Sequence, residues 1–364
     1  MIRRSRSLFA LLAIVALAGA ACASEDNASE DDSGGEAASS DVTVCQVTDT
    51  GGVDDRSFNQ TANEGLVRAE DELGVEGKVL ESTDEADFEP NIDTFISEGC
   101  DLIIPVGFLL DEATQTAAQA NPDQKFAIVD VDFFDADAGE DISYDNVEEL
   151  TFATDEAAFL AGYAAAGTSK SGKVGTFGGI NIPTVTIFMD GFLAGVQQYN
   201  ADFGKNVEVL GWDGTDGLFT GDFSDVDKGK SYTKDLIDEG ADIIMPVAGP
   251  VGTGTITEVK ERNNPDLGIV WVDVDGCVSL PEDCQYFLTS VEKKMDVAVF
   301  DSIQSVVDDA FKAGLYVGTL ENEGVDIADY QDWDSKVPDD VKAKVDEYRE
   351  KIIDGSQSVE PSAG

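Results

Sequence analysis

Short apolar runs alternate with amphipathic helical patterns along most of the chain. In the first part, the apolar runs predict strands at 42–47, 78–81, 101–106 and 125–131. The helical patterns between them predict helices at 59–73, 91–98 and 110–120. Each strand pattern is a nearly continuous apolar run, which is typical of strands that are covered on both faces. This order therefore predicts a doubly wound parallel sheet of the α/β class.

The same alternation starts again after about residue 150. Strands are predicted at 173–178, 207–212, 242–247 and 267–272. Helices are predicted at 156–167, 184–199, 228–239 and 253–263. Two doubly wound lobes with a hinge and a cleft between them are the natural architecture for such a repeat.

The expected lobe boundaries follow from this repeat. We expect an N-terminal lobe at 41–150, completed by about 275–300, and a C-terminal lobe at 151–272, completed by about 300–364. A strand at 285–290 and a helix at 295–313 need partners that are formed earlier, so the chain must cross back between the lobes. The region 329–353 is expected to be a helical tail.

The beginning of the chain has the pattern of an export signal. Three arginines precede the apolar run Leu8 to Leu17, and small residues lead from it to Cys22. The run is too short to span a bilayer comfortably, so residues 1–21 are interpreted as a removable signal peptide. Cys22 has the position of a lipoprotein cysteine, and ordinary cleavage near this residue is the alternative. Residues 22–40 are acidic and predict a flexible tether, which would place the protein on the outer face of the cell membrane.

Composition removes several classes of function. The chain has 23 basic and 74 acidic residues, a formal net charge of −51, and no histidine. Nucleic-acid binding needs basic surface and is excluded. Histidine-based metal sites and histidine-dependent catalytic triads are also excluded. As a separate expectation, the protein is neither an enzyme nor the holder of a cofactor. We interpret the acidity as a solvation adaptation to high salt, with a specific cation site as the alternative.

Four cysteines remain besides Cys22, and four thiols allow three connectivities. Cys45 and Cys100 each border a predicted strand of the first lobe. Cys277 and Cys284 close a short loop. We therefore favour the pairs Cys45–Cys100 and Cys277–Cys284.

Candidate chemistry is concentrated in the loops that follow the strands. Ligands of open α/β sheets bind outside the carboxyl ends of the strands, and these loops carry aromatic residues and carboxylates but few basic groups. Carboxylates accept hydrogen bonds from sugar hydroxyls or from the donor edge of a heterocycle, and aromatic faces stack on a base. The pattern predicts a flat, neutral, hydroxyl-rich ligand rather than a phosphate. Helix capping by Asp54 and Asp55, and simple core packing by Phe58 and Phe223, are alternative roles for these side chains.

The sequence of these loops resembles the basic membrane protein family of lipoproteins over roughly residues 42–320. The resemblance is carried by the stretches 48–60 (TDTGGVDDRSFNQ), 125–130 (KFAIVD), 146–162 (NVEELTFATDEAAFLAG), 191–196 (GFLAGV), 223–230 (FSDVDKGK), 240–249 and 288–298 (LTSVEKKMDVA). The best understood members of this family bind purine nucleosides for ABC import. The resemblance implies a type I periplasmic-binding-protein fold, permease subunits as membrane partners, and closure of the two lobes on the ligand.

The resemblance also assigns roles on the base side of the ligand. It implies that Phe58 and Phe223 sandwich the base. Asn59 and Asp130 would hydrogen-bond the edge of the base, where a carboxylate suits N–H donors. Asp49 would lie beside the site.

On the ribose side, the resemblance implies that Asp273 and Lys293 hold the hydroxyls and that Gly249 offers backbone contact. The chain departs from the family at Pro250 and Val251, where glycine and threonine are usual, and this changes the backbone conformations that the loop can adopt.

Three other functions are weighed against nucleoside import. One is a type I protein that binds a sugar, and another is a lipid-anchored sensor that reports its ligand to a membrane receptor. A third, from another class, is a nucleoside hydrolase, whose aspartate-rich first loop is superficially similar to Asp49–Asp55. No histidine is available to protonate a leaving base, so the hydrolase is disfavoured.

Overall fold

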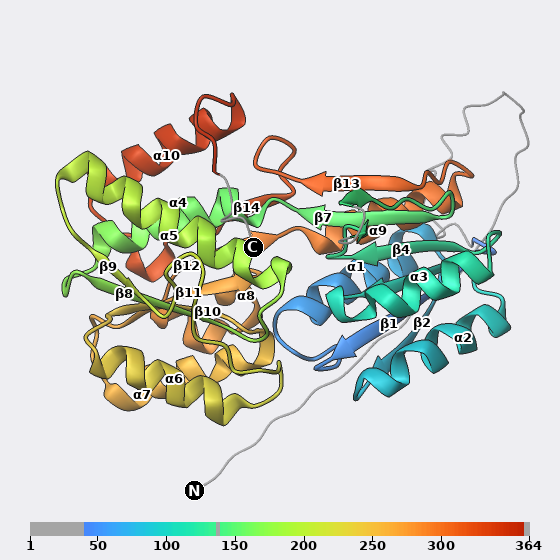
Figure 1. The fold of residues 1–364 in the computed structure, drawn as a ribbon, viewed down its shortest axis with the longest axis horizontal. Helices are drawn as coiled ribbons and strands as arrows, with labels where there is room; N and C mark the ends of the chain where they lie inside the picture. Colours follow the sequence, from blue (N-terminus) through green and yellow to red (C-terminus); the bar gives the residue numbers. More distant parts are fainter. Residues whose placement is uncertain (1–39, 136–138, 360–364) are drawn as a thin grey trace, which may run out of the picture. The chain divides into compact units, whose positions relative to one another are not determined.

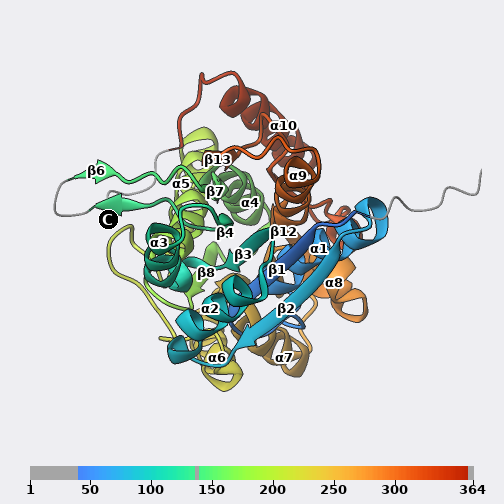
Figure 2. The same ribbon diagram turned by 90° about the vertical axis from the view of Figure 1, so that its right-hand side faces the viewer.

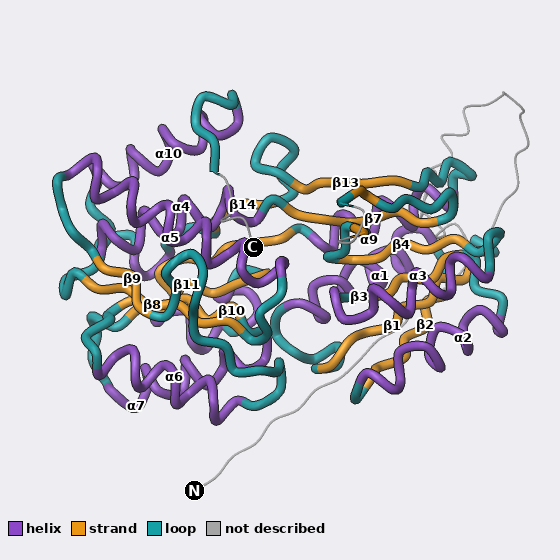
Figure 3. The backbone as a smooth tube through the Cα atoms, in the orientation of Figure 1, coloured by secondary structure: helices purple, strands orange, loops and turns teal. Residues whose placement is uncertain are grey.

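The computed structural model describes residues 40–135 and 139–359, which all fall within one compact unit, Ala37–Gly364. The predicted signal peptide, Cys22 and nearly all of the predicted tether lie outside the described residues. Strands and helices alternate along most of the described chain, as the sequence pattern predicts (Figure 3).

The first lobe is built on a six-stranded parallel sheet with the order β13-β7-β4-β3-β1-β2 (Figure 1). Its strands are β1 (Thr43–Thr50), β2 (Glu76–Ser82), β3 (Leu102–Val106), β4 (Lys125–Val129), β7 (Val147–Phe152) and β13 (Gly314–Gly318). A small antiparallel pair, β5 (Phe134–Asp135) and β6 (Glu140–Asp141), is attached to it after β4.

Helices cover both faces of this sheet. The helices are α1 (Phe58–Leu73), α2 (Phe88–Glu98), α3 (Asp111–Ala120) and α9 (Met295–Val307). Figure 2 shows α2 and α3 on one side of the sheet and α1 and α9 on the other. Successive strand residues therefore enter different cores, and in β1 the side chain of Val44 packs with one cluster while Cys45 packs with the other.

The second lobe repeats this plan with the sheet order β14-β12-β11-β10-β8-β9. Its strands are β8 (Lys173–Gly178), β9 (Glu208–Leu210), β10 (Ile243–Val247), β11 (Gly268–Asp273), β12 (Phe287–Lys293) and β14 (Val325–Ile327). All neighbours are parallel except β14, which runs antiparallel to β12. The predicted architecture of two doubly wound α/β lobes is confirmed.

The helices of the second lobe also form two layers. They are α4 (Thr154–Thr168), α5 (Pro183–Phe203), α6 (Val226–Asp238), α7 (Thr253–Arg262), the short α8 (Gly276–Ser279) and α10 (Asp339–Ile353). α4 packs against α5 and α10, and α6 packs against α7 on the opposite face of the sheet (Figure 1). The predicted helical tail corresponds to α10, which covers α4. No helix of the described residues is both long and apolar enough to span a bilayer.

The predicted lobe boundaries need correction. Most of the region 275–300 belongs to the second lobe, because β12 pairs with β11 in the second sheet. It is α9 and β13 that return to the first lobe, and β13 pairs with β7. The boundary at residue 151 also falls inside β7. The helix predicted at 295–313 ends at Val307, and the chain then forms β13, whose exposed Leu315 and Val317 mark an edge strand.

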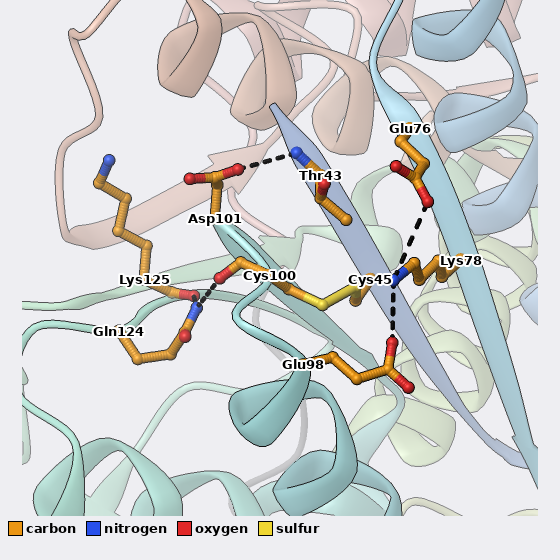
Figure 4. Close-up of a disulfide and its surroundings, with 9 residues drawn as sticks. All are labelled: Thr43, Cys45, Glu76, Lys78, Glu98, Cys100, Asp101, Gln124 and Lys125. Carbon is orange, nitrogen blue, oxygen red and sulfur yellow. Dashed lines mark hydrogen bonds and ion pairs between the residues drawn. A yellow bond between two sulfur atoms is a disulfide. The ribbon is translucent and has the colours of Figure 1, made fainter. Parts of the chain in front are cut away.

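The structure contains the two favoured disulfides, Cys45–Cys100 and Cys277–Cys284. Figure 4 shows the first one, which ties β1 to the turn before β3. Both of its cysteines are buried in the core beneath α2 and α3. The second bond closes the loop that holds α8. The first pair is separated by 55 residues in the sequence and the second by 7.

The longer loop predicts the larger stabilisation. Closing a loop removes conformational entropy from the unfolded chain, so the double variant Cys45→Ala/Cys100→Ala is expected to lose about 4 kcal/mol of unfolding free energy. The matched variant Cys277→Ala/Cys284→Ala is expected to lose about 2.5 kcal/mol. Urea unfolding at a fixed high salt concentration measures both values. Equal losses, or a larger loss from the second pair, would contradict this ranking.

Candidate functional site

The carboxyl ends of strands from both sheets border one cleft. Its lining includes every residue for which the sequence predicts ligand contact, namely Asp49, Phe58, Asn59, Asp130, Phe223, Gly249, Asp273 and Lys293. The space that the lining surrounds, together with solvent at its mouth, is about 550 Å³.

Four of these residues come from the first lobe. Asp49 lies near the end of β1, Phe58 and Asn59 begin α1, and Asp130 directly follows β4. The other four come from the second lobe. Phe223 lies in the loop before α6, Gly249 begins the turn after β10, and Asp273 and Lys293 end β11 and β12.

Asp130 and Asp273 occupy equivalent places in the two lobes. β4 and β11 have the same position in the two sheet orders, and each is followed or ended by an aspartate with a positive φ. The φ angles are 62° at Asp130 and 71° at Asp273. This left-handed conformation is costly for residues other than glycine and is concentrated at functional sites. Here it accompanies the convergence of both carboxylates on Lys293.

Lys293 is the only basic residue in the lining, and it is 3% exposed. Its Nζ pairs with Oδ2 of Asp130 and lies 3.9 Å from Oδ1 of Asp273. The same nitrogen lies 5.1 Å from the ring centroids of both Phe58 and Phe188. The ammonium is therefore stabilised by two carboxylates and by aromatic faces.

The two lobes are also joined by a hydrogen bond. Ser57 Oγ, just before α1, donates to Asp273 Oδ2 at 2.6 Å. Burial raises the pKa of Asp273 to about 6, although Lys293 and Ser57 oppose the shift. Burial also raises the pKa of Asp130, against the attraction of Lys293.

Asp55 caps a helix, which is the role that the sequence analysis gives as the alternative to ligand contact. Its carboxylate accepts from the backbone N–H groups of Ser57, Asn59 and Gln60 at 2.9, 2.8 and 3.0 Å. These bonds satisfy amides at the start of α1. Asp55 also lines the cleft, and its capping bonds fix the helix end that carries Phe58 and Asn59.

Asp49 and Asn59 form a buried pair. Asn59 Nδ2 donates to Asp49 Oδ1 at 2.9 Å. Burial raises the pKa of Asp49 to about 8, and the neighbouring carboxylates add to this shift. A Cβ atom at Gly107 would lie only 2.4 Å from Asp49 Oδ2, so the glycine leaves the room that this carboxyl needs.

The loop that carries Phe223 is held by its own ion pair. Lys228 Nζ donates to the carbonyl of Thr220 at 2.9 Å and to Asp222 Oδ2 at 3.1 Å. The Phe223 ring packs on Gly179, where a Cβ atom would lie 2.3 Å from a ring carbon. The position of the ring is therefore fixed by its packing against the residue that follows β8.

Gly249 has a φ of 51°, which favours glycine. Pro250, the first departure from the family pattern, follows it and lines the cleft. Val251, the second departure, is fully buried and does not contribute to the lining. Only the proline therefore changes the wall of the cleft directly.

Sequence reasoning missed part of the apolar wall, which is formed by Leu109, Ile182, Val185 and Phe188. Phe108, an aromatic residue that follows the third strand, also lines this wall. Phe188 has the helical spacing of a core residue, and its ring does pack in the core of the second lobe. The Phe188 ring also contacts Lys293. This contact depends on how the lobes meet, so the local sequence does not predict it. Within the described residues, no cluster of three or more histidine, cysteine, aspartate or glutamate side chains is placed to hold a metal ion.

Comparison with known proteins gives one consistent family. Residues 42–361 match the sequence model described as ABC transporter substrate-binding protein PnrA-like. The chain is 34% identical to the CD4+ T-cell-stimulating antigen of Listeria innocua, over 98% of this chain and 99% of that protein. It is 33% identical to the ABC transporter nucleoside-binding protein BmpA of Lactococcus lactis, over 97% of each. An ABC transporter solute-binding protein structure from Aeropyrum pernix has a TM-score of 0.79 and 27% identity, and covers 89% of this chain and 94% of that one.

The raised pKa of Asp49 predicts a pH-dependent contribution to stability. The unfolded chain loses this proton near pH 3.8, whereas the folded chain keeps it to about pH 8. Stability from this group is therefore complete below about pH 4 and falls as the pH rises to about 8. Asp49→Asn has no proton to lose, so its unfolding free energy relative to the unsubstituted protein is expected to increase across this window.

Urea unfolding at several pH values and constant salt, without added ligand, measures the difference. Asp71→Asn, at an exposed position on α1, is the matched control and is expected to show no such trend. A constant difference between Asp49→Asn and the unsubstituted protein from pH 4 to 8 would show that the Asp49 pKa is not raised.

Proposed function

Since this chain belongs to the family of PnrA-like ABC transporter substrate-binding proteins, we propose that its cleft captures a purine nucleoside for import. The protein would then present the closed, ligand-bound form to the membrane subunits of an ABC transporter. The family consists of solute-binding proteins rather than enzymes.

The observation that carries this proposal is the composition of the cleft wall. A phenylalanine from each lobe, Phe58 and Phe223, lines the same cleft as the carboxylates of Asp130 and Asp273 and the ammonium of Lys293. Aromatic rings stack on a heterocyclic base, and the charged groups suit N–H donors and ribose hydroxyls. The name of the Lactococcus lactis relative, a nucleoside-binding protein, agrees with this ligand class.

The charge balance of the wall disfavours nucleotides. The lining contains the carboxylates of Asp49, Asp55, Asp130 and Asp273, and the only basic side chain is already paired. The wall therefore offers a phosphate no unpaired cation, and the carboxylates of Asp130 and Asp273 would repel it. The uncharged nucleoside is therefore the form that fits the cleft.

Ligand capture is coupled to the relative position of the lobes. The Asp130–Lys293 ion pair and the Ser57–Asp273 hydrogen bond both join the first lobe to the second. A ligand that contacts residues of both lobes favours the closed arrangement by the contacts that exist only there. We propose that these two links hold the closed form while the rings of Phe58 and Phe223 enclose the base.

Removing either ring tests the stacking. Phe58→Ala and Phe223→Ala are each expected to weaken the binding of inosine by about 1–3 kcal/mol, which is roughly 5- to 150-fold in Kd. Isothermal titration calorimetry on residues 41–364 in high salt measures this loss. Phe203→Ala, at a half-buried phenylalanine at the end of α5 that does not line the cleft, is the control and is expected to leave the Kd unchanged.

The same titrations separate the alternative functions. If ribose or another sugar gives binding heat and no nucleoside does, the ligand is a sugar and the proposed transport role still stands. Release of free base and ribose from a nucleoside would replace binding with hydrolysis. Full inosine affinity in both ring variants would show that the two phenylalanines do not stack on the base.

We further propose that Cys22 carries the lipid anchor. If so, Cys22→Ser abolishes labelling by radioactive palmitate, and the protein leaves the membrane fraction for the medium, because an unacylated chain has no anchor. Ala23→Ser keeps the cysteine and is the matched control. Equal labelling and equal membrane association of Cys22→Ser and the unsubstituted protein would assign anchoring to another feature.

A further inference from the structure

One polar atom in the wall of the cleft has no partner. The Oδ1 atom of Asn59 is buried, and it accepts no hydrogen bond from the described residues. Asn59 itself is 1% exposed, and it lines the cleft. A buried acceptor without a donor is costly, so a ligand that brings a donor to this atom binds more tightly than one that does not.

Asp49 determines which end of the Asn59 amide is available. Because Nδ2 donates to Asp49 Oδ1 at 2.9 Å, the amide nitrogen is directed at the carboxyl and the carbonyl oxygen is left without a partner. A proton on Asp49 does not reverse this arrangement as long as it is carried on Oδ2, since Oδ1 remains an acceptor. The carboxyl therefore selects one of the two orientations of the amide.

The neighbouring polar groups of the wall are also mostly acceptors. Asp55 is occupied by the amides of α1, and Asp273 accepts from Ser57. Asp130 is paired with Lys293 through Oδ2 only, which leaves its second oxygen able to accept. A base edge that faces Asn59 and Asp130 therefore meets acceptors, and it must itself supply donors.

We propose that Asp49 is a positioning residue that fixes the carbonyl of Asn59 toward the ligand and thereby makes the cleft select purine bases with an N–H donor edge. The inference rests on the proposed nucleoside function and gives it a specificity. Guanine offers a ring N–H beside an amino group, and hypoxanthine offers the ring N–H alone. Adenine has an acceptor nitrogen beside its amino group, which the carboxylates repel. Purine riboside has neither donor.

A series of nucleosides tests the selection on the unsubstituted protein. Guanosine is expected to bind most tightly, followed by inosine and then adenosine. Purine riboside is expected to bind about ten- to a hundredfold more weakly than guanosine, because Asn59 Oδ1 then stays unpaired. Titration calorimetry at pH 7 in high salt gives the four Kd values. Binding of purine riboside within about threefold of guanosine would overturn the donor-edge selection.

Asp49→Asn tests the positioning role. The new amide can donate to Asn59 Oδ1, which allows the Asn59 amide to reverse and to offer its NH₂ group to the ligand. The ratio of the purine riboside and guanosine Kd values is therefore expected to fall by about tenfold, while guanosine still binds. This ratio is the readout, because a general loss of structure weakens all ligands together. Asp54→Asn, which does not line the cleft, is expected to keep the ratio of the unsubstituted protein.

The outcomes separate the two proposals. No binding of any purine nucleoside would overturn the proposed function itself. Binding with an unchanged ratio in Asp49→Asn would leave nucleoside capture intact and overturn the role of Asp49. Circular dichroism and thermal unfolding show whether Asp49→Asn and Asp54→Asn fold. If Asp49→Asn does not fold, the nucleoside series on the unsubstituted protein still tests the donor-edge selection.

Discussion

A single buried ammonium group connects the two halves of this protein. Lys293 ends a strand of the second lobe, yet its ion-pair partner, Asp130, belongs to the first. Removing a charge from water costs several kcal/mol unless partners replace the solvent, so the lysine requires Asp130 and Asp273 beside it. The arrangement of the lobes, the charge of the cleft and the position of the Phe58 ring therefore depend on one another. A change in any of them alters the solvation of this group.

The doubled fold explains how these partners are brought together. Both sheets end their equivalent strands β4 and β11 at an aspartate in the left-handed conformation, and the two lobes face each other across these ends. Each carboxylate is thereby placed by a rigid strand rather than by a long loop, and the cost of its backbone conformation is met by the sheet around it. The start of α1, capped by Asp55, supplies the remaining polar groups from an equally rigid helix end.

The sequence predicts this framework well because continuous apolar runs reveal buried parallel strands, and strand ends reveal the cleft. It fails where the pattern weakens or depends on contacts between lobes. β13 is an edge strand with exposed Leu315 and Val317, so its pattern does not distinguish it from the end of a helix. After β12 the chain returns to the first lobe, where β13 pairs with β7 at the edge of the first sheet. The local residues do not indicate this return. The contact of Phe188 with Lys293 could not be predicted either, because Phe188 has the helical spacing of a core residue. The orientation of the Asn59 amide could not be predicted because it depends on a hydrogen bond to Asp49 in another element.

The acidic residues of this chain act in two different physical settings. Among the described residues, most acidic side chains lie outside the core, where salt screens their mutual repulsion. The cleft carboxylates are nearly free of solvent, and burial raises the pKa of Asp49, Asp130 and Asp273. Salt screens such buried groups weakly. Their stability therefore depends on hydrogen bonds and ion pairs from the protein or the ligand. We therefore expect high salt to favour the folded state through the surface, and we expect hydrogen bonds in the cleft, on which salt has little effect, to decide the choice of ligand.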